Sequence, residues 1–133
     1  KAWGEDRFWN PTWIKFREAV TLPQAIEDSE EAAFRQQALA RCLIAYASDM
    51  GLVSTAVLPH QTSTNRSEIQ MASLDHSMWI HRAVPLDDWL LFHKRTSTAQ
   101  SSRGMVHSEF FAESGVLVAS MSQEGLLRKR RSD

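Results

Sequence analysis

A single long helical pattern occupies the first half of this chain, and strand-like segments make up most of the rest. Beyond Arg41 the pattern is apolar on nearly every side, which indicates that other elements enclose the predicted helix. Asp28 and Glu31 predict the helix start, and Gly51 predicts its end. Apolar residues at helical spacing define one face of this helix: Phe34, Ala38, Cys42, Tyr46 and Met50.

Strand patterns lie on both sides of this helix. Alternating residues predict one strand at 12–20, and four more follow the helix at about 69–82, 88–98, 103–113 and 116–129. The last four are joined by short connections, which favour antiparallel neighbours. These connections are Pro85-Leu86-Asp87, Ser101-Ser102 and Glu113-Ser114-Gly115. We therefore expect an α+β fold with a curved antiparallel sheet wrapped around one long central helix.

Composition limits the possible functions. The 133 residues suffice for one domain that needs no disulfide or metal to fold. A formal net charge of −1 argues against general nucleic-acid binding. The single cysteine, Cys42, cannot form an internal disulfide, and its place in the apolar pattern predicts a buried thiol. We expect a reducing, intracellular compartment, and no apolar run of membrane-spanning length.

The N-terminal residues are rich in aromatic side chains, and the chain begins with Lys1 rather than methionine. Such a segment is typical of one that covers another surface. We expect residues 1–133 to be a single domain that belongs to a longer protein or lacks its partner. The aromatic residues concerned are Trp3, Phe8, Trp9 and Trp13.

Three polar residues interrupt apolar elements, and this suggests one shared site. Asp49 ends the helical pattern, Ser73 begins S-L-D-H-S-M-W-I-H-R, and Gln123 interrupts V-L-V-A-S-M-S-Q-E-G-L-L. Strand alternation predicts that Ser73 and Asp75 share one face. Taken singly, each residue also has a structural interpretation: a helix-end carboxylate, a small core residue, and a buried amide that ties strand ends together.

The run Asp75-His76-Ser77 does not predict a catalytic triad, because neighbours on a strand face opposite ways. We interpret Asp75 and His76 as structural residues that pin the strand by hydrogen bonds. The five histidines show no metal-binding spacing. Arg103, at a strand start, is either a surface residue or a contact for an anionic group.

Several ordered blocks closely resemble the C-terminal half of acyl-CoA thioesterase II, over residues from about 34 to 128. They are A-Y-A-S-D-M (45–50), S-L-D-H-S-M-W-I-H-R (73–82), D-D-W-L-L-F (87–92), S-S-R-G (101–104) and V-L-V-A-S-M-S-Q-E-G-L-L-R (116–128). That family has a double hotdog fold, in which two sheets each wrap a helix. The resemblance implies one hotdog domain here, with the N-terminal hotdog absent.

The resemblance also implies roles for individual residues. Asp49, Ser73 and Gln123 match the family residues that hold and activate the water that attacks the thioester, without a covalent acyl-enzyme. Arg103 is a candidate contact for a CoA phosphate, and His76 a candidate substrate contact. The chain departs from the family after Arg82, where A-V-P-L replaces the usual P-F.

We expect hydrolysis of acyl-CoA to a free fatty acid and CoA, with no cofactor and no metal. The expected partners are the substrate and either the N-terminal hotdog or a second hotdog copy in a homo-oligomer. Relatives in this family occur in bacterial cytosol and in peroxisomes, so the resemblance implies one of these two compartments. One alternative is a non-catalytic hotdog module that dimerises or binds CoA. A hotdog hydratase is less favoured, because Asp75 and His76 are adjacent in a strand.

Overall fold

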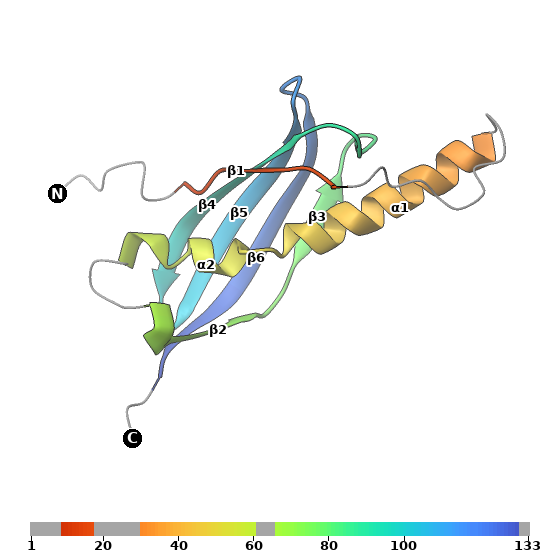
Figure 1. The fold of residues 1–133 in the computed structure, drawn as a ribbon. Coiled ribbons are helices and arrows are strands. Elements are labelled where there is room, and N and C mark those ends of the chain that lie inside the picture. Colours follow the sequence, from red (N-terminus) through yellow and green to blue (C-terminus); the bar gives the residue numbers. More distant parts are fainter. Residues whose placement is uncertain (1–8, 18–29, 61–65, 131–133) are drawn as a thin grey trace.

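The computed structural model describes residues 9–17, 30–60 and 66–130. Helix α1 (Glu30–Ser48) and the short α2 (Leu52–Thr55) lie across one face of a six-stranded antiparallel sheet (Figure 1). The strand order is β1-β4-β5-β6-β2, and β3 also pairs with β6. The strands are β1 (Thr12–Ile14), β2 (Ile69–Ser73), β3 (Ser77–Ile80), β4 (Leu90–Gln100), β5 (Arg103–Ala112) and β6 (Leu117–Lys129). The predicted α+β architecture is confirmed.

The hydrophobic core fills the space between the helices and the three long strands. Alternate residues of β4, β5 and β6 are buried, because strand side chains point to opposite faces in turn. The rings of Phe92 and Phe110 stack on neighbouring strands with centroids 4.3 Å apart. Leu90, Val106 and Met121 extend this layer under the helices.

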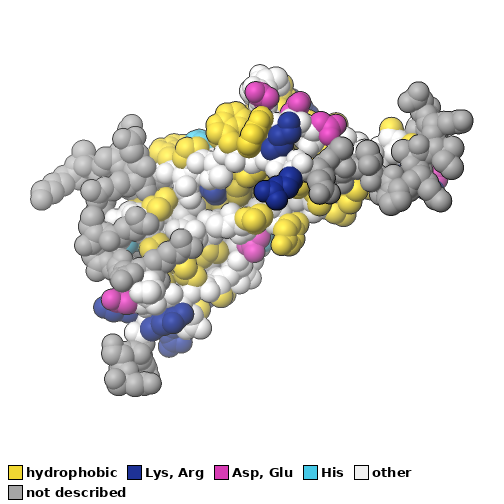
Figure 2. Space-filling view, in the orientation of Figure 1, with side chains coloured by type: hydrophobic (Ala, Val, Ile, Leu, Met, Phe, Trp, Pro, Cys, Tyr) yellow, Lys and Arg dark blue, Asp and Glu magenta, His cyan; other side chains and the backbone are white. Residues whose placement is uncertain are grey.

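The curved sheet packs on α1 as predicted, but it covers one side only, and the other apolar side, which the sequence pattern predicted to be covered as well, is exposed. The residues of α1 that are buried all lie in its second half: Ala40, Ile44, Ala47 and Ser48. The first half projects past the sheet (Figure 1). Phe34 in this first half is 70% exposed, and on the uncovered side further along Tyr46 and Met50 are 78% and 63% exposed. Cys42, expected to be a buried thiol, lies in the same stripe and is exposed. Hydrophobic side chains are visible along the course of α1 in Figure 2.

The connection from β3 to β4 is not the expected hairpin. β3 pairs with β6, whereas β4 lies between β1 and β5, so residues 81–89 pass from one side of the sheet to the other. On the way Val84 is buried, and its backbone N–H donates to Oε1 of Gln37 on α1 at 3.0 Å. The short connection at residues 85–87 was compatible with a hairpin, but the strand that pairs with β3 is β6 and not β4.

The other turns agree with the sequence. Ser101 and Ser102 join β4 to β5 with φ of 51° and 60°, the left-handed pair that suits a two-residue hairpin. Gly51, with φ of 71°, follows the last turn of α1 as expected. The first strand, predicted at 12–20, is shorter in the structure: β1 ends at Ile14. Residues 18–20 of the prediction lie outside the described residues. Asp28, the predicted start of the helix, also lies outside the described residues, as do the aromatic residues Trp3 and Phe8.

The helical stretch Glu30–His60 corrects one sequence-based expectation. It contains an 18-residue window with a mean hydropathy of 1.4, so by length and composition it could cross a membrane. Half of that window is buried inside the structure. Core helices reach such values as well, and this stretch packs on the sheet and turns at Gly51.

A pair of glycines lets α2 lie close to the sheet. Gly104 on β5 and Gly125 on β6 are directly opposite each other in the ladder, and both are buried. A Cβ on Gly104 would lie 2.5 Å from the Cβ of Ala56, and one on Gly125 would overlap the methyl groups of Val53. The absence of side chains here therefore sets the depth at which the helices rest.

Replacing Gly125 by Ala should lower the free energy of unfolding by about 1–3 kcal/mol, since the new methyl overpacks a filled site. Urea unfolding followed by circular dichroism measures this. Gly115→Ala is the matched control: its Cβ meets nothing within 4 Å, so it costs only the ~1 kcal/mol of a left-handed alanine. Adding Val53→Ala should recover part of the Gly125→Ala loss. A Gly125→Ala variant as stable as the unchanged chain would refute the close contact.

Lys94 is an unusual buried cation. It lies on the core side of β4 with 4% exposure, and its Nζ donates to the hydroxyl of Thr12 at 2.9 Å. The ammonium also lies 4.6 Å from the ring centroid of Phe92. No carboxylate among the described residues forms a salt bridge with it. Burial lowers the pKa of Lys94 below its ordinary value of 10.5.

This lysine should make stability depend on alkaline pH. The unfolded chain binds the Lys94 proton more tightly than the folded chain, so stability rises as the pH increases from the lowered pKa towards 10.5. Lys94→Met removes this contribution. Urea unfolding should show that the variant is more stable than the unchanged chain at pH 7. This difference in the free energy of unfolding should be smaller at pH 10. A difference that grows with pH would contradict the sign.

Candidate functional site

Asp49 stands directly after the last residue of α1. The helix ends because Gly51 adopts a left-handed conformation and α2 then starts in a new direction. Ser48 is fully buried against the sheet, whereas Asp49 is exposed. The carboxylate therefore lies at the boundary between the core and the solvent, above the edge where β2 pairs with β6.

Ser73 and Gln123 reach this position from neighbouring strands. Ser73 ends β2 opposite Gly125, and β3 resumes the pairing with Ser77 opposite Ser122. Three residues of the edge strand, 74–76, thus span only two of β6, 123–124. The extra residue is a bulge, which interrupts the alternation and re-aims the side chains around it.

The bulge corrects the predicted faces. Asp75 does not share a site with Ser73; its Oδ1 accepts the backbone N–H of Glu124 at 2.8 Å and pins the bulge. This confirms the structural role expected for Asp75. His76, expected to face away from Ser73, instead contacts the same amide as Ser73. One inserted residue is enough to change the side, because the strand period is two.

The three residues Asp49, Ser73 and Gln123 form a closed set of hydrogen bonds. Nε2 of Gln123 donates to Asp49 Oδ1 at 2.8 Å and to Ser73 Oγ at 2.6 Å. The Ser73 hydroxyl donates to the same Asp49 Oδ1 at 3.0 Å. Gln123 has no exposed surface, whereas Asp49 and Ser73 are exposed. The structure therefore brings together the three residues selected from the sequence, and leaves two of them open to solvent.

The two oxygens of the Asp49 carboxylate have different hydrogen-bond partners. Oδ1 accepts two hydrogen bonds, and Oδ2 accepts none from the part of the chain that the structure describes. An ionised carboxylate with one anchored oxygen and one unengaged oxygen can accept a proton from a solvent molecule without losing its orientation. Ser73 donates to that carboxylate rather than to a histidine, so the hydroxyl is not arranged as a nucleophile of the Ser-His kind.

His76 and Ser48 extend this set, and sequence reasoning missed their connection. Nδ1 of His76 lies 2.5 Å from Gln123 Oε1, and Nε2 lies 2.8 Å from Ser48 Oγ. The Ser48 hydroxyl also reaches the backbone carbonyl of Ala45 at 2.6 Å. Both ring nitrogens of the suggested substrate contact are thus engaged within the chain. The available signal in the sequence was Ser48, a polar residue in the apolar helical pattern one position before Asp49.

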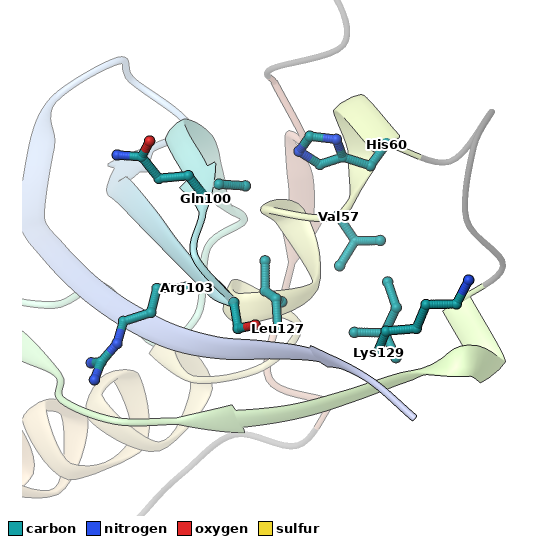
Figure 3. Close-up of a pocket in the computed structure, with 9 residues that line it drawn as sticks. Val57, His60, Gln100, Arg103, Leu127 and Lys129 are labelled. Carbon is teal, nitrogen blue, oxygen red and sulfur yellow. The ribbon is translucent and has the colours of Figure 1, made fainter. Parts of the chain in front are cut away.

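Arg103 lies beside the site rather than in it. Its guanidinium donates to Glu124 at 2.7 Å, and more than half of its side chain is exposed. The residue borders a cavity of about 190 Å³, from which the guanidinium extends away (Figure 3). The ion pair favours the surface role; a contact with a CoA phosphate stays a prediction. The cavity is lined by Val57, His60, Ile69, Ala99, Gln100, Ser102, Arg103, Leu127 and Lys129.

Comparison with known proteins places this chain in a family. The sequence profile described as acyl-CoA thioesterase matches residues 19–126. The chain is 42% identical over 87 residues to acyl-coenzyme A thioesterase 8 of Mus musculus, covering 65% of this chain and 27% of that protein. It is 36% identical over 88 residues to acyl-CoA thioesterase 2 of Haemophilus influenzae, covering 66% and 31%.

A solved structure gives the same result. The crystal structure of an acyl-CoA thioesterase II from Mycobacterium marinum superimposes with a TM-score of 0.74 at 34% identity, covering 92% of this chain and 42% of that one. The chain thus spans less than a third of the length of these two curated relatives. It belongs to the acyl-CoA thioesterase family and has the hotdog fold of its structural neighbours, one helix packed on a curled antiparallel sheet.

Proposed function

We propose that this chain carries a hydrolytic centre for acyl-CoA thioesters, in which Asp49, Ser73 and Gln123 orient one water molecule. The observation that carries the proposal is the shared Oδ1 of Asp49, which accepts from both Gln123 and Ser73 and leaves Oδ2 available. The relatives described above are all named acyl-CoA thioesterases, which supports the substrate class.

In this proposal Asp49 is the general base. Its free Oδ2 takes a proton from the water while the water oxygen attacks the thioester carbonyl carbon. The C–S bond then breaks, and CoA leaves as a thiolate that takes up a proton. A thiol has a pKa of about 8.5, so its thiolate departs without a strong acid. The products are a carboxylic acid and CoA, and no bond to the protein forms.

The two neutral residues have different tasks. Both N–H groups of Gln123 are used on Asp49 and Ser73, and its buried position keeps those two residues in one place. Ser73 is exposed and its oxygen retains an unused lone pair, so it can accept a hydrogen bond from the water. Orientation of the water thus comes from Ser73 and Asp49, and rigidity comes from Gln123.

Asp49→Asn should reduce kcat for release of CoA from an acyl-CoA by about 10²–10⁴-fold, because an amide cannot take the proton. The melting temperature should change little, since Asn keeps an oxygen that accepts from Gln123. Thiol release in the longest gene product that contains this chain is the assay. Asp87→Asn, the same change on an exposed loop, is the matched control and should keep full activity. Full activity of Asp49→Asn would end the assignment.

We also propose that a second hotdog unit covers the exposed stripe of α1. The stripe consists of Phe34, Ala38, Cys42, Tyr46 and Met50, all exposed in the structure. Large exposed apolar patches are typical of interaction surfaces. The relatives that this chain matches are more than twice as long as it is, which supports a covering unit of the same family. The non-catalytic alternative takes this form: a chain that pairs but hydrolyses nothing alone.

The 133-residue chain on its own should therefore associate with itself. Sedimentation velocity should show a dimer that dissociates on dilution, and the double variant Phe34→Ser, Tyr46→Ser should shift it to monomer. Trp89→Ser, which removes a 45% exposed aromatic ring from a loop, is the matched control and should leave the dimer intact. A chain that stays monomeric at every concentration would contradict the pairing. Thiol release by the same samples distinguishes a catalytic unit from a purely pairing one.

A further inference from the structure

The amide of Gln123 can occupy its site in two orientations that differ by a half turn of the terminal group. The two orientations have nearly the same shape, so packing does not choose between them. In one, the NH₂ group faces Asp49 and Ser73. In the other, the amide oxygen faces the carboxylate of Asp49 and two hydrogen bonds are replaced by repulsion between acceptors. Asp49 therefore favours the first orientation, and a donor on the other side of the amide would reinforce it.

His76 lies where it can supply that donor. Its Nδ1 is 2.5 Å from Gln123 Oε1, on the side of the amide opposite Asp49 and Ser73. A protonated Nδ1 donates to an oxygen at that position and would clash with an NH₂ group. A single N–H of the imidazole ring therefore reinforces the orientation in which Asp49 receives a donor.

The ring is in turn held by the helix that ends at the site. Nε2 of His76 lies 2.8 Å from the hydroxyl of Ser48, which is fully buried in the last turn of α1. That hydroxyl has one proton and two partners, His76 Nε2 and the carbonyl of Ala45, so it can meet the ring as donor or as acceptor. In both cases Nδ1 must carry a proton to bond Gln123.

We propose that His76, held by Ser48, is a positioning residue that fixes the orientation of Gln123 and through it the carboxylate of Asp49. This inference rests on the proposed function of Asp49. His76 does not touch the reacting atoms; both its ring nitrogens are engaged by Gln123 and Ser48. The chain of contacts runs from α1 to the bulge between β2 and β3, then to β6, and back to Asp49 after α1.

Two variants of His76 separate orientation from simple packing. His76→Leu keeps a branched side chain but leaves Gln123 Oε1 without a donor. His76→Asn can place an NH₂ group near the position of Nδ1 and restore the donor. We expect His76→Leu to lower kcat by about 10- to 100-fold with KM nearly unchanged, the size of one lost hydrogen bond in a charged network. His76→Asn should recover most of the loss.

The control reactions keep this proposal apart from the previous one. If Asp49→Asn is inactive and His76→Leu keeps its kcat, positioning by His76 is refuted and the function of Asp49 stands. If Asp49→Asn is fully active, the proposed function itself fails. Equal losses of kcat in the Leu and Asn variants, in step with their melting temperatures, would mean that His76 acts only through packing.

A measurement on the unchanged chain tests the proton directly, whether or not the variants fold. Long-range ¹H–¹⁵N correlation spectra of the histidine rings report which nitrogen is protonated. The proposal requires a protonated Nδ1 in His76, and Ser48→Ala should alter the Nε2 shift of the same ring. A His76 with an unprotonated Nδ1 would overturn the proposal.

Discussion

The buried amide of Gln123 is the interaction on which the site depends. An amide removed from water costs roughly 1–3 kcal/mol for each hydrogen-bonding group left without a partner. Here every group has one: the two N–H bonds go to Asp49 and Ser73, and the oxygen meets His76. Because one planar group joins three side chains from separate elements, none of them can move without breaking its bond to Gln123. The polar interruption of an apolar strand is thereby stable and orders its neighbours.

The fold provides this meeting point through two local departures from regular structure. The bulge between β2 and β3 turns His76 towards Gln123 and lets Asp75 bond the backbone of Glu124. The glycines at 104 and 125 let α2, which follows the turn that carries Asp49, rest close to the sheet. Both departures lie beside residues 122–125 of β6, where the pairing with β5 is regular, and the register shift in that ladder lies further along, between Phe110 and Phe111.

Much of this could be predicted from sequence, and the failures have physical causes. The helix, the strands and the two-residue turn at Ser101-Ser102 follow from periodicity and turn chemistry. Asp49, Ser73 and Gln123 were identifiable because each is polar in an apolar element. The exposure of Cys42 and Tyr46 could not be predicted, because periodicity defines an apolar face of a helix without showing what covers that face. The bulge could not be predicted either, because one inserted residue leaves no trace in an alternating pattern. Strand alternation alone therefore put His76 on the face opposite Ser73.

The central claim is that water, and not a protein group, attacks the thioester. A single turnover in ¹⁸O-labelled water, with enzyme in excess over acyl-CoA, tests this most directly. If Asp49 acts as a base, the first fatty acid formed carries one labelled oxygen, and mass spectrometry of the peptide containing Asp49 finds no label. If instead Asp49 attacks the thioester and water then opens the resulting anhydride at the Asp49 carbon, the first product is unlabelled and the label appears in the Asp49 carboxylate, which would contradict the account.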